Sequence, residues 1–224
     1  MLSFDKKRAH LSAILFIMNL SRPWALIRSP IDMEVLRVLR GTTRPLTGRE
    51  VARLVSSGSQ PTVNASLRRL SEEGVVGAQE AGNAFLYTFN REHLGAPAIE
   101  LLADVRLELQ RRLREEIASW QIAPVHASIF GSAARGDGDT TSDIDIFVVR
   151  PRGVSDDDAS WREQLARLSD HVLEWTGNHA GLSEVSEADT RRLRRERPPI
   201  VDELGHDAIT IAGPEPTVLL GASR

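Results

Sequence analysis

Apolar and polar positions follow two different periods in the first ninety or so residues. Residues 31–41, 47–54 and 60–73 repeat apolar side chains every three or four positions, which predicts three helices. Their apolar positions are Ile31, Val35, Leu36, Leu39, Val51, Leu54, Val63, Leu67 and Leu70. Residues 75–89 then alternate, with Phe85, Tyr87 and Phe89 on one face, which predicts a β-hairpin that turns at Gly82-Asn83.

Local signals place the ends of these helices. Gly41 suits the C-terminal end of the first helix, and Gly74 that of the third. Thr47 and Glu50 form a capping box, in which each side chain bonds the backbone of the other residue at a helix start. Residues 57–59, Ser-Gly-Ser, break the second helix. The first part of the chain is therefore expected to consist of three short helices and a hairpin.

A longer amphipathic pattern follows. Residues 97–120 predict one long helix, because its apolar side chains recur at helical spacing. This stripe consists of Leu101, Leu102, Val105, Leu109, Leu113 and Ile117. We expect the helix to connect two halves of the chain, and it is a candidate contact for a homodimer. Pro124 marks its end.

Strand and helix patterns alternate in the second half. Strands are expected at 125–130, 144–149 and 179–185, and helices at 161–175 and 186–197. Residues 207–212 could close the sheet or pack beside it. The fold class is therefore α+β. We divide the chain into an N-terminal extension (1–28), a first domain (29–92), a connecting helix (93–120) and a second domain with a small mixed sheet (121–224).

Composition and charge add limits to this picture. The absence of cysteine excludes disulfides, thiolate metal sites and a cysteine nucleophile, and it fits a cytoplasmic protein. Residues 1–120 carry 17 basic and 13 acidic side chains, whereas residues 121–224 carry 11 and 18, which suggests different partners for the two halves. Residues 6–18 imitate a signal peptide but lack a cleavage site, and they are too short to span a membrane. We expect Met18 to be the natural start and residues 1–17 to be an extension upstream of it.

The strongest chemical signal begins where the first strand of the second domain ends. Gly131-Ser132 lets the backbone approach an anion closely, and the hydroxyl of Ser132 adds a donor. Arg135, one turn further on, could neutralise phosphate charge. Asp143 and Asp145 flank one apolar residue on a strand, so both carboxylates project from the same face. Two adjacent carboxylates repel each other unless a cation lies between them, and Mg²⁺ is the expected cation.

This combination resembles the DNA polymerase β nucleotidyltransferase superfamily, in particular its small bacterial members. Their motif is Gly-Ser, a spacer and Asp-x-Asp, and ten residues separate Ser132 from Asp143 here. The resemblance covers about residues 121–212. It implies a third carboxylate on a neighbouring strand that helps to hold metal and accepts a proton. Glu184 is the candidate; if Gly181 occupies that position instead, the third acid is missing.

The resemblance also implies a reaction. Gly131, Ser132 and Arg135 would bind a nucleoside triphosphate, and two Mg²⁺ ions on Asp143 and Asp145 would align its α-phosphorus. A nucleoside monophosphate would pass to a hydroxyl on an unidentified acceptor, which could be a protein, a tRNA or a small molecule such as an antibiotic.

The first domain resembles winged helix-turn-helix regulators of the bacterial multiple-antibiotic-resistance and arsenic-repressor types. The resemblance covers residues 29–92 and implies that residues 60–70 form a recognition helix in the major groove of DNA. Its candidate DNA-binding residues are Gln60, Thr62, Asn64, Arg68 and Arg69. The hairpin tip carries Glu80 but no lysine or arginine, and the domain could instead serve as a scaffold that recruits protein. The alternative function is a transcriptional regulator, or a toxin–antitoxin component, whose transferase domain only binds nucleotide.

Overall fold

The computed structural model describes residues 18 and 20–221, so the expectation for residues 1–17 lies outside the described residues. The chain forms two compact units, with the boundary between Val105 and Arg106. This boundary falls inside the segment predicted as a connecting helix. Each unit has its own hydrophobic core and is described by itself.

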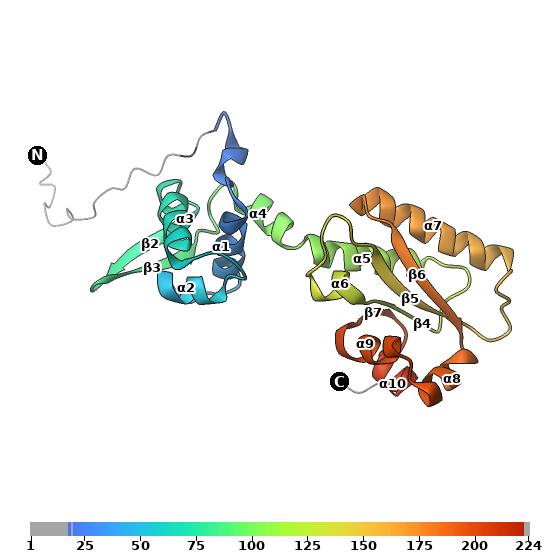
Figure 1. Cartoon of the computed structure of the whole chain (residues 1–224). Coiled ribbons are helices and arrows are strands. Elements are labelled where there is room, and N and C mark those ends of the chain that lie inside the picture. Colours follow the sequence, from blue (N-terminus) through green and yellow to red (C-terminus); the bar gives the residue numbers. More distant parts are fainter. Residues whose placement is uncertain (1–17, 19, 222–224) are drawn as a thin grey trace, which may run out of the picture. The chain divides into compact units, whose positions relative to one another are not determined.

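The N-terminal unit follows the predicted order of elements (Figure 1). After a 3₁₀ turn, Pro23–Leu26, come α1 (Pro30–Arg40), α2 (Gly48–Leu54) and α3 (Gln60–Glu72). The hairpin consists of β2 (Val76–Ala81) and β3 (Ala84–Phe89), and the predicted capping box at Thr47 opens α2. One strand was not predicted: β1 (Leu46–Thr47) pairs antiparallel with β3, which gives a sheet in the order β1-β3-β2. A strand of two residues is too short to give a periodic signal in the sequence.

The core of this unit lies between the three helices and the inner end of the hairpin. Its buried side chains include most of the apolar positions that the helical spacing predicted, joined by Val75, Val76 and Phe89. Two predicted positions differ, because Ile31 is only partly buried and Leu54 is 56% exposed. One charged residue is also buried. The carboxylate of Asp32, 2% exposed, accepts hydrogen bonds from the backbone of Arg28 and Ser29 and from the hydroxyl of Ser66.

The predicted long helix is in fact two helices. They are α4 (Ala96–Ala103) and α5 (Val105–Ala118), and Asp104 between them has the non-helical dihedrals φ −101° and ψ 6°. The Asp104 carboxylate forms an ion pair with Arg40. The apolar stripe also divides, because Ile99 is buried in the core of the N-terminal unit, whereas Leu113 and Ile117 are buried in the other unit. Leu101 and Leu102, between these groups, are exposed.

The C-terminal unit is built on a four-stranded mixed sheet in the order β6-β5-β4-β7. The strands are β4 (His126–Ile129), β5 (Ile144–Arg150), β6 (Ala180–Ser186) and β7 (Ile209–Ala212). Strands β5 and β6 run parallel, and the other pairs are antiparallel. This sheet contains the predicted strands, and of residues 207–212 the segment Ile209–Ala212 forms its edge strand β7.

Helices cover both faces of this sheet (Figure 1). On one face, α5 and α7 (Ala159–Thr176) pack against Ile146 and Val148. On the other face, α9 (Pro199–Asp207) and α10 (Pro216–Leu220) pack against Phe147 and Val149. The remaining helices are the short α6 (Gly131–Arg135) and α8 (Asp189–Glu196). Because alternate residues of β5 reach opposite faces, its apolar run is buried on both sides.

A search of the described residues for membrane spans found no helix with the length and apolar character needed to cross a bilayer.

Candidate active site

The two aspartates lie where β5 begins. Asp143 directly precedes β5 and is exposed, while Asp145, the second residue of the strand, is partly buried. The backbone N–H of Phe130 donates to the carbonyl oxygen of Asp145 over 3.0 Å. This bond holds the Gly131-Ser132 turn against the start of β5. The structure therefore brings together the two parts of the motif that the sequence separates by ten residues.

Two glycines enclose the carboxylate of Asp145. A Cβ atom on Gly131 would lie 2.6 Å from Asp145 Oδ2, and a Cβ atom on Gly181 would lie 2.7 Å from Oδ1. Gly131 also has φ +64°, a conformation that side chains other than glycine rarely adopt. The positive φ and this close approach together favour glycine at position 131, whereas a side chain at position 181 would require the Asp145 carboxylate to move.

The electrostatic environment of Asp145 opposes its negative charge. Burial raises the pKa of this carboxyl above its ordinary value, and the neighbouring carboxylates of Asp143 and Glu203 raise it further. The guanidinium of Arg135 acts in the opposite direction. A cation bound between the aspartates would relieve this repulsion. Glu203, on α9, was not among the predicted residues, since nothing in the local sequence relates it to a strand sixty residues earlier.

Ser132 and Arg135 both belong to the short helix α6. The carbonyl oxygen of Ser132 accepts from the backbone N–H of Gly136 over 2.7 Å. Gly138 passes close to the Ser132 hydroxyl, since a Cβ atom there would lie 2.9 Å from its Oγ. The guanidinium of Arg135 forms ion pairs with Asp137 at 3.0 Å and with Asp207 at 2.9 Å. Arg135 is thus close to the aspartates but already paired with other carboxylates.

The expectation that Glu184 is the third carboxylate is wrong in this structure. In the register of β5 with β6, Asp145 is opposite Gly181, whereas Glu184 is opposite Val148. An offset of three residues turns Glu184 to the other face of the sheet, where α7 packs. There its carboxylate accepts from Trp161 Nε1 at 2.9 Å and pairs with Arg150 at 3.0 Å. The position next to Asp145 is occupied by Gly181.

The donor set at the aspartates fits one magnesium ion. Both side chains offer hard oxygen ligands, and Mg²⁺ is commonly bound by one or two carboxylates together with substrate phosphates and water. Among the described residues, no group of three or more His, Cys, Asp or Glu side chains has an arrangement that could hold a metal. Other ligands would therefore have to come from the substrate or from water.

The predicted DNA-binding residues separate into two groups. Gln60, Asn64 and Arg68 are exposed and line one groove of the N-terminal unit, and Thr62 is exposed beside Ser59. Arg69 is the exception, because its guanidinium turns into the protein. It forms an ion pair with the buried Asp32 at 2.5 Å and donates to the carbonyl oxygen of Leu26 at 2.9 Å. The expectation that Arg69 faces DNA is therefore wrong; a rotation of one residue around α3 separates it from Arg68.

Comparisons with known proteins bear on the C-terminal unit. Residues 110–195 match the family model described as nucleotidyltransferase domain. A search of curated proteins gave no match.

Solved structures are similar over about half of the chain. A toxin–antitoxin complex with AMP-PNP shares 15% identity and covers 50% of this chain and 81% of its own, with a TM-score of 0.35. A variant of the toxin–antitoxin pair MntA–HpeT shares 15% identity over 52% and 81%, with a TM-score of 0.32. A protein from Sulfolobus solfataricus named as a nucleotidyltransferase shares 21% identity over 47% and 85%, with a TM-score of 0.27. These TM-scores carry no argument about function, and the match to the nucleotidyltransferase-domain model covers residues 110–195, a segment that includes Gly131, Ser132, Asp143 and Asp145.

Proposed function

We propose that the C-terminal unit transfers a nucleoside monophosphate from a nucleoside triphosphate to a hydroxyl of an acceptor. The observation that carries this proposal is the position of Asp145, two residues after Asp143, beside the Gly131-Ser132 turn, to which the hydrogen bond from the Phe130 N–H to the Asp145 carbonyl oxygen ties it. Carboxylates for a metal and a backbone turn for phosphate are the two parts that this chemistry requires.

Each of these residues would have a separate role. Backbone N–H groups of Gly131 and Ser132, with the Ser132 hydroxyl, would bind the triphosphate. Arg135 would neutralise phosphate charge after releasing Asp137 or Asp207. Asp143 and Asp145 would hold Mg²⁺, which when bound stabilises the charge on the entering and leaving oxygens. In the reaction, a bond from the acceptor oxygen to the α-phosphorus forms while the bond to pyrophosphate breaks.

One observation favours a second candidate function. Gly181 lies opposite Asp145, where the resemblance places a third carboxylate, so β6 provides no acid at that position to accept the acceptor's proton. A unit of this kind could bind nucleotide without turning it over. The chain would then be a nucleotide-responsive regulator or a component of a toxin–antitoxin pair. In either case we propose that the exposed face of α3, with Gln60, Asn64 and Arg68, binds DNA.

The test is incubation with each α-labelled nucleoside triphosphate, Mg²⁺ and a cell extract that supplies acceptors. The Asp143→Asn/Asp145→Asn variant should lose all transfer of label. The Asp156→Asn/Asp157→Asn variant is the matched control, because it removes two exposed carboxylates outside the site. Transfer of label to an acceptor by the wild type and the control, but not by the Asp143→Asn/Asp145→Asn variant, supports the transferase proposal. Binding of nucleotide without transfer of label, for all four nucleotides, would refute the transferase proposal and favour the second candidate function.

A further inference from the structure

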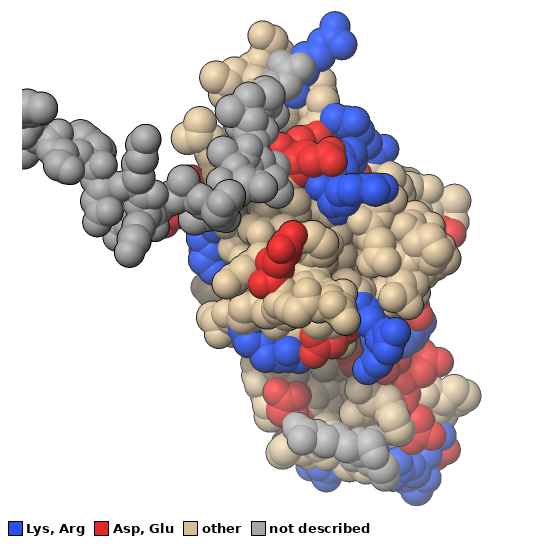
Figure 2. All heavy atoms as spheres, turned by 90° about the vertical axis from the view of Figure 1, so that its left-hand side faces the viewer, with Lys and Arg blue, Asp and Glu red and all other residues tan. Residues whose placement is uncertain are grey.

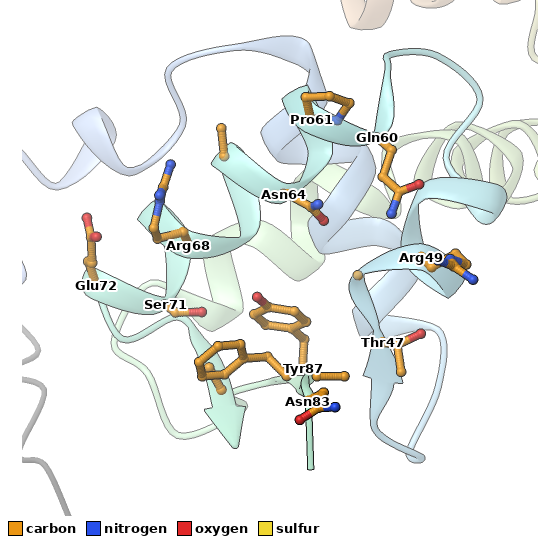
Figure 3. A pocket seen from close by; sticks show the side chains of 15 residues that line it. Thr47, Arg49, Gln60, Pro61, Asn64, Arg68, Ser71, Glu72, Asn83 and Tyr87 are labelled. Carbon is orange, nitrogen blue, oxygen red and sulfur yellow. The ribbon is translucent and has the colours of Figure 1, made fainter. Parts of the chain in front are cut away.

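The N-terminal unit has a groove between α3 and the β2–β3 hairpin, with a volume of about 870 Å³ (Figure 3). We name it the helix–hairpin groove. Its lining includes Arg49, Gln60, Asn64, Arg68, Phe85 and Tyr87. In the close view, Arg68 lies on one side of the groove and Arg49 on the other, with Tyr87 between them. The size is that of a site for a small organic molecule or for one or two nucleotides.

The arginines of this groove differ from most arginines of the unit, because within the described part of the chain they have no acidic partner. Six others are neutralised in ion pairs: Arg28, Arg37, Arg40, Arg44, Arg69 and Arg91. Arg49, Arg53 and Arg68 form no ion pair with any residue that the structure describes, and Arg49 and Arg68 are the two that line the groove. Unpaired exposed guanidinium groups are suited to bind phosphate, because no carboxylate has to be displaced first.

The floor of the groove is aromatic. Phe85 and Tyr87 lie on the same face of β3, with ring centroids 6.3 Å apart and planes tilted by 34°. Phe85 is 45% exposed, so part of its ring faces solvent. Exposed aromatic faces next to cations are the arrangement on which unpaired bases stack. The amides of Gln60 and Asn64, on α3, offer donors and acceptors for base edges.

The charge of the groove is low for a duplex. Its lining also includes Glu72, and Glu80 lies opposite Phe85 in the hairpin register, so two acids accompany the two unpaired arginines. Figure 2 shows basic and acidic side chains interspersed among broad uncharged areas on the face in view, without a continuous basic surface. A duplex presents the phosphates of two strands and keeps its base faces stacked inside, whereas a single strand presents fewer phosphates and open base faces.

We propose that the helix–hairpin groove binds an unpaired DNA strand, with one base stacked on Phe85 and with Arg49 and Arg68 binding flanking phosphates. This inference rests on the proposal that the N-terminal unit binds DNA, and it specifies the form of DNA that is bound. It gives the hairpin, which has no basic residue near its tip, a function through its aromatic face. It also adds Arg49, on α2, to the contacts expected on α3.

The experiment measures fluorescence anisotropy of a short labelled oligonucleotide with the full chain. The same sequence is tested as a single strand and as a duplex, at several salt concentrations and without nucleoside triphosphate. The variants are Phe85→Leu, which keeps an apolar side chain but removes the aromatic face, and Phe85→Trp, which restores it. Arg49→Gln is paired with Arg53→Gln, its matched control, because Arg53 is an unpaired arginine of the same helix outside the lining.

We expect the single strand to bind more tightly than the duplex. Phe85→Leu should weaken single-strand binding about tenfold, and Phe85→Trp should restore it. Arg49→Gln should weaken binding and lower the magnitude of the salt slope by about 0.7, while Arg53→Gln should change neither. Two results would refute binding of a single strand in the helix–hairpin groove while leaving DNA binding by the unit intact. One is tighter binding of the duplex that Phe85→Leu does not change; the other is an equal effect of Arg49→Gln and Arg53→Gln. Failure of both forms of DNA to bind would overturn DNA binding by this unit altogether.

Discussion

Replacement of Asp32 by asparagine should destabilise the N-terminal unit and leave the other unit unchanged. The carboxylate accepts from the backbone N–H groups of Arg28 and Ser29, both at 2.8 Å, and from the Ser66 hydroxyl at 2.6 Å. It also forms an ion pair with Arg69 at 2.5 Å, and only 19% of the Arg69 side chain is exposed, so both partners are shielded from water. One residue therefore closes the first turn of α1 and joins α1 to α3.

The magnitude follows from what the substitution leaves behind. Asp32 is 2% exposed, so water does not replace the lost charge. Removal of one partner from a buried ion pair leaves the other charge uncompensated, which costs about 3–5 kcal/mol. Arg69 keeps a second partner, Glu73, at 3.2 Å, so we expect the lower part of that range. Because Arg69→Gln removes the same interaction, the double variant should cost less than the two single losses added together.

Hydrogen exchange of the full chain, followed by mass spectrometry of peptides, separates the two units. Peptides from α1 and α3 should lose protection by about 3 kcal/mol, whereas those from α7 should be unaffected. A loss below about 1 kcal/mol in α1 and α3 would refute the reasoning, since the pair would then behave like a surface ion pair. Equal losses in α7 would show that the effect is not local to this unit. Arg69→Gln protein that retains its fold but binds DNA less tightly would restore the discarded role of Arg69 at the DNA surface.

Three further predictions concern pH, the glycine turn and Glu184. Burial alone would raise the pKa of Asp32, but its hydrogen bonds and Arg69 hold this pKa below the ordinary value of 3.8. The carboxylate therefore stabilises the unit above that pH, and this stabilisation is lost as the pH falls below it. Hydrogen exchange in α1, measured during an acid titration, should show the loss in wild type but not in Asp32→Asn. Gly131→Ala should abolish Mg²⁺-nucleotide binding in calorimetry, because the new Cβ would meet the Asp145 carboxylate. The control Gly153→Ala also has positive φ but open space around it, so it should bind nucleotide normally and lose only about 1 kcal/mol of stability. Glu184→Gln should leave nucleotide affinity unchanged and reduce the stability of the C-terminal unit by about 1–2 kcal/mol in urea titration, because it weakens a half-buried ion pair; a weakened affinity for Mg²⁺ would return Glu184 to the metal site.

The sequence by itself determined the features that depend on neighbouring residues. The capping box at Thr47 and Glu50, the hairpin turn at Gly82 and the three short helices are set by backbone bonds over a few positions, and the structure has them where the pattern predicts them. The Asp-x-Asp spacing predicted a shared face for Asp143 and Asp145, because alternate residues of extended backbone project to the same side. The strand–turn–helix context of Gly131-Ser132 was equally readable, since each element has its own local signal.

Tertiary structure decided which distant residues meet. The β5–β6 register places Gly181 rather than Glu184 beside Asp145, and a strand pattern carries no information about its register with a partner. The rotation of α3 turns Arg69 toward Asp32 and leaves Arg68 in the groove, although the two residues are adjacent in sequence. The break at Asp104 arises because residues on either side pack into two different cores. In each case the outcome depends on packing between elements far apart in the chain, which local periodicity does not encode.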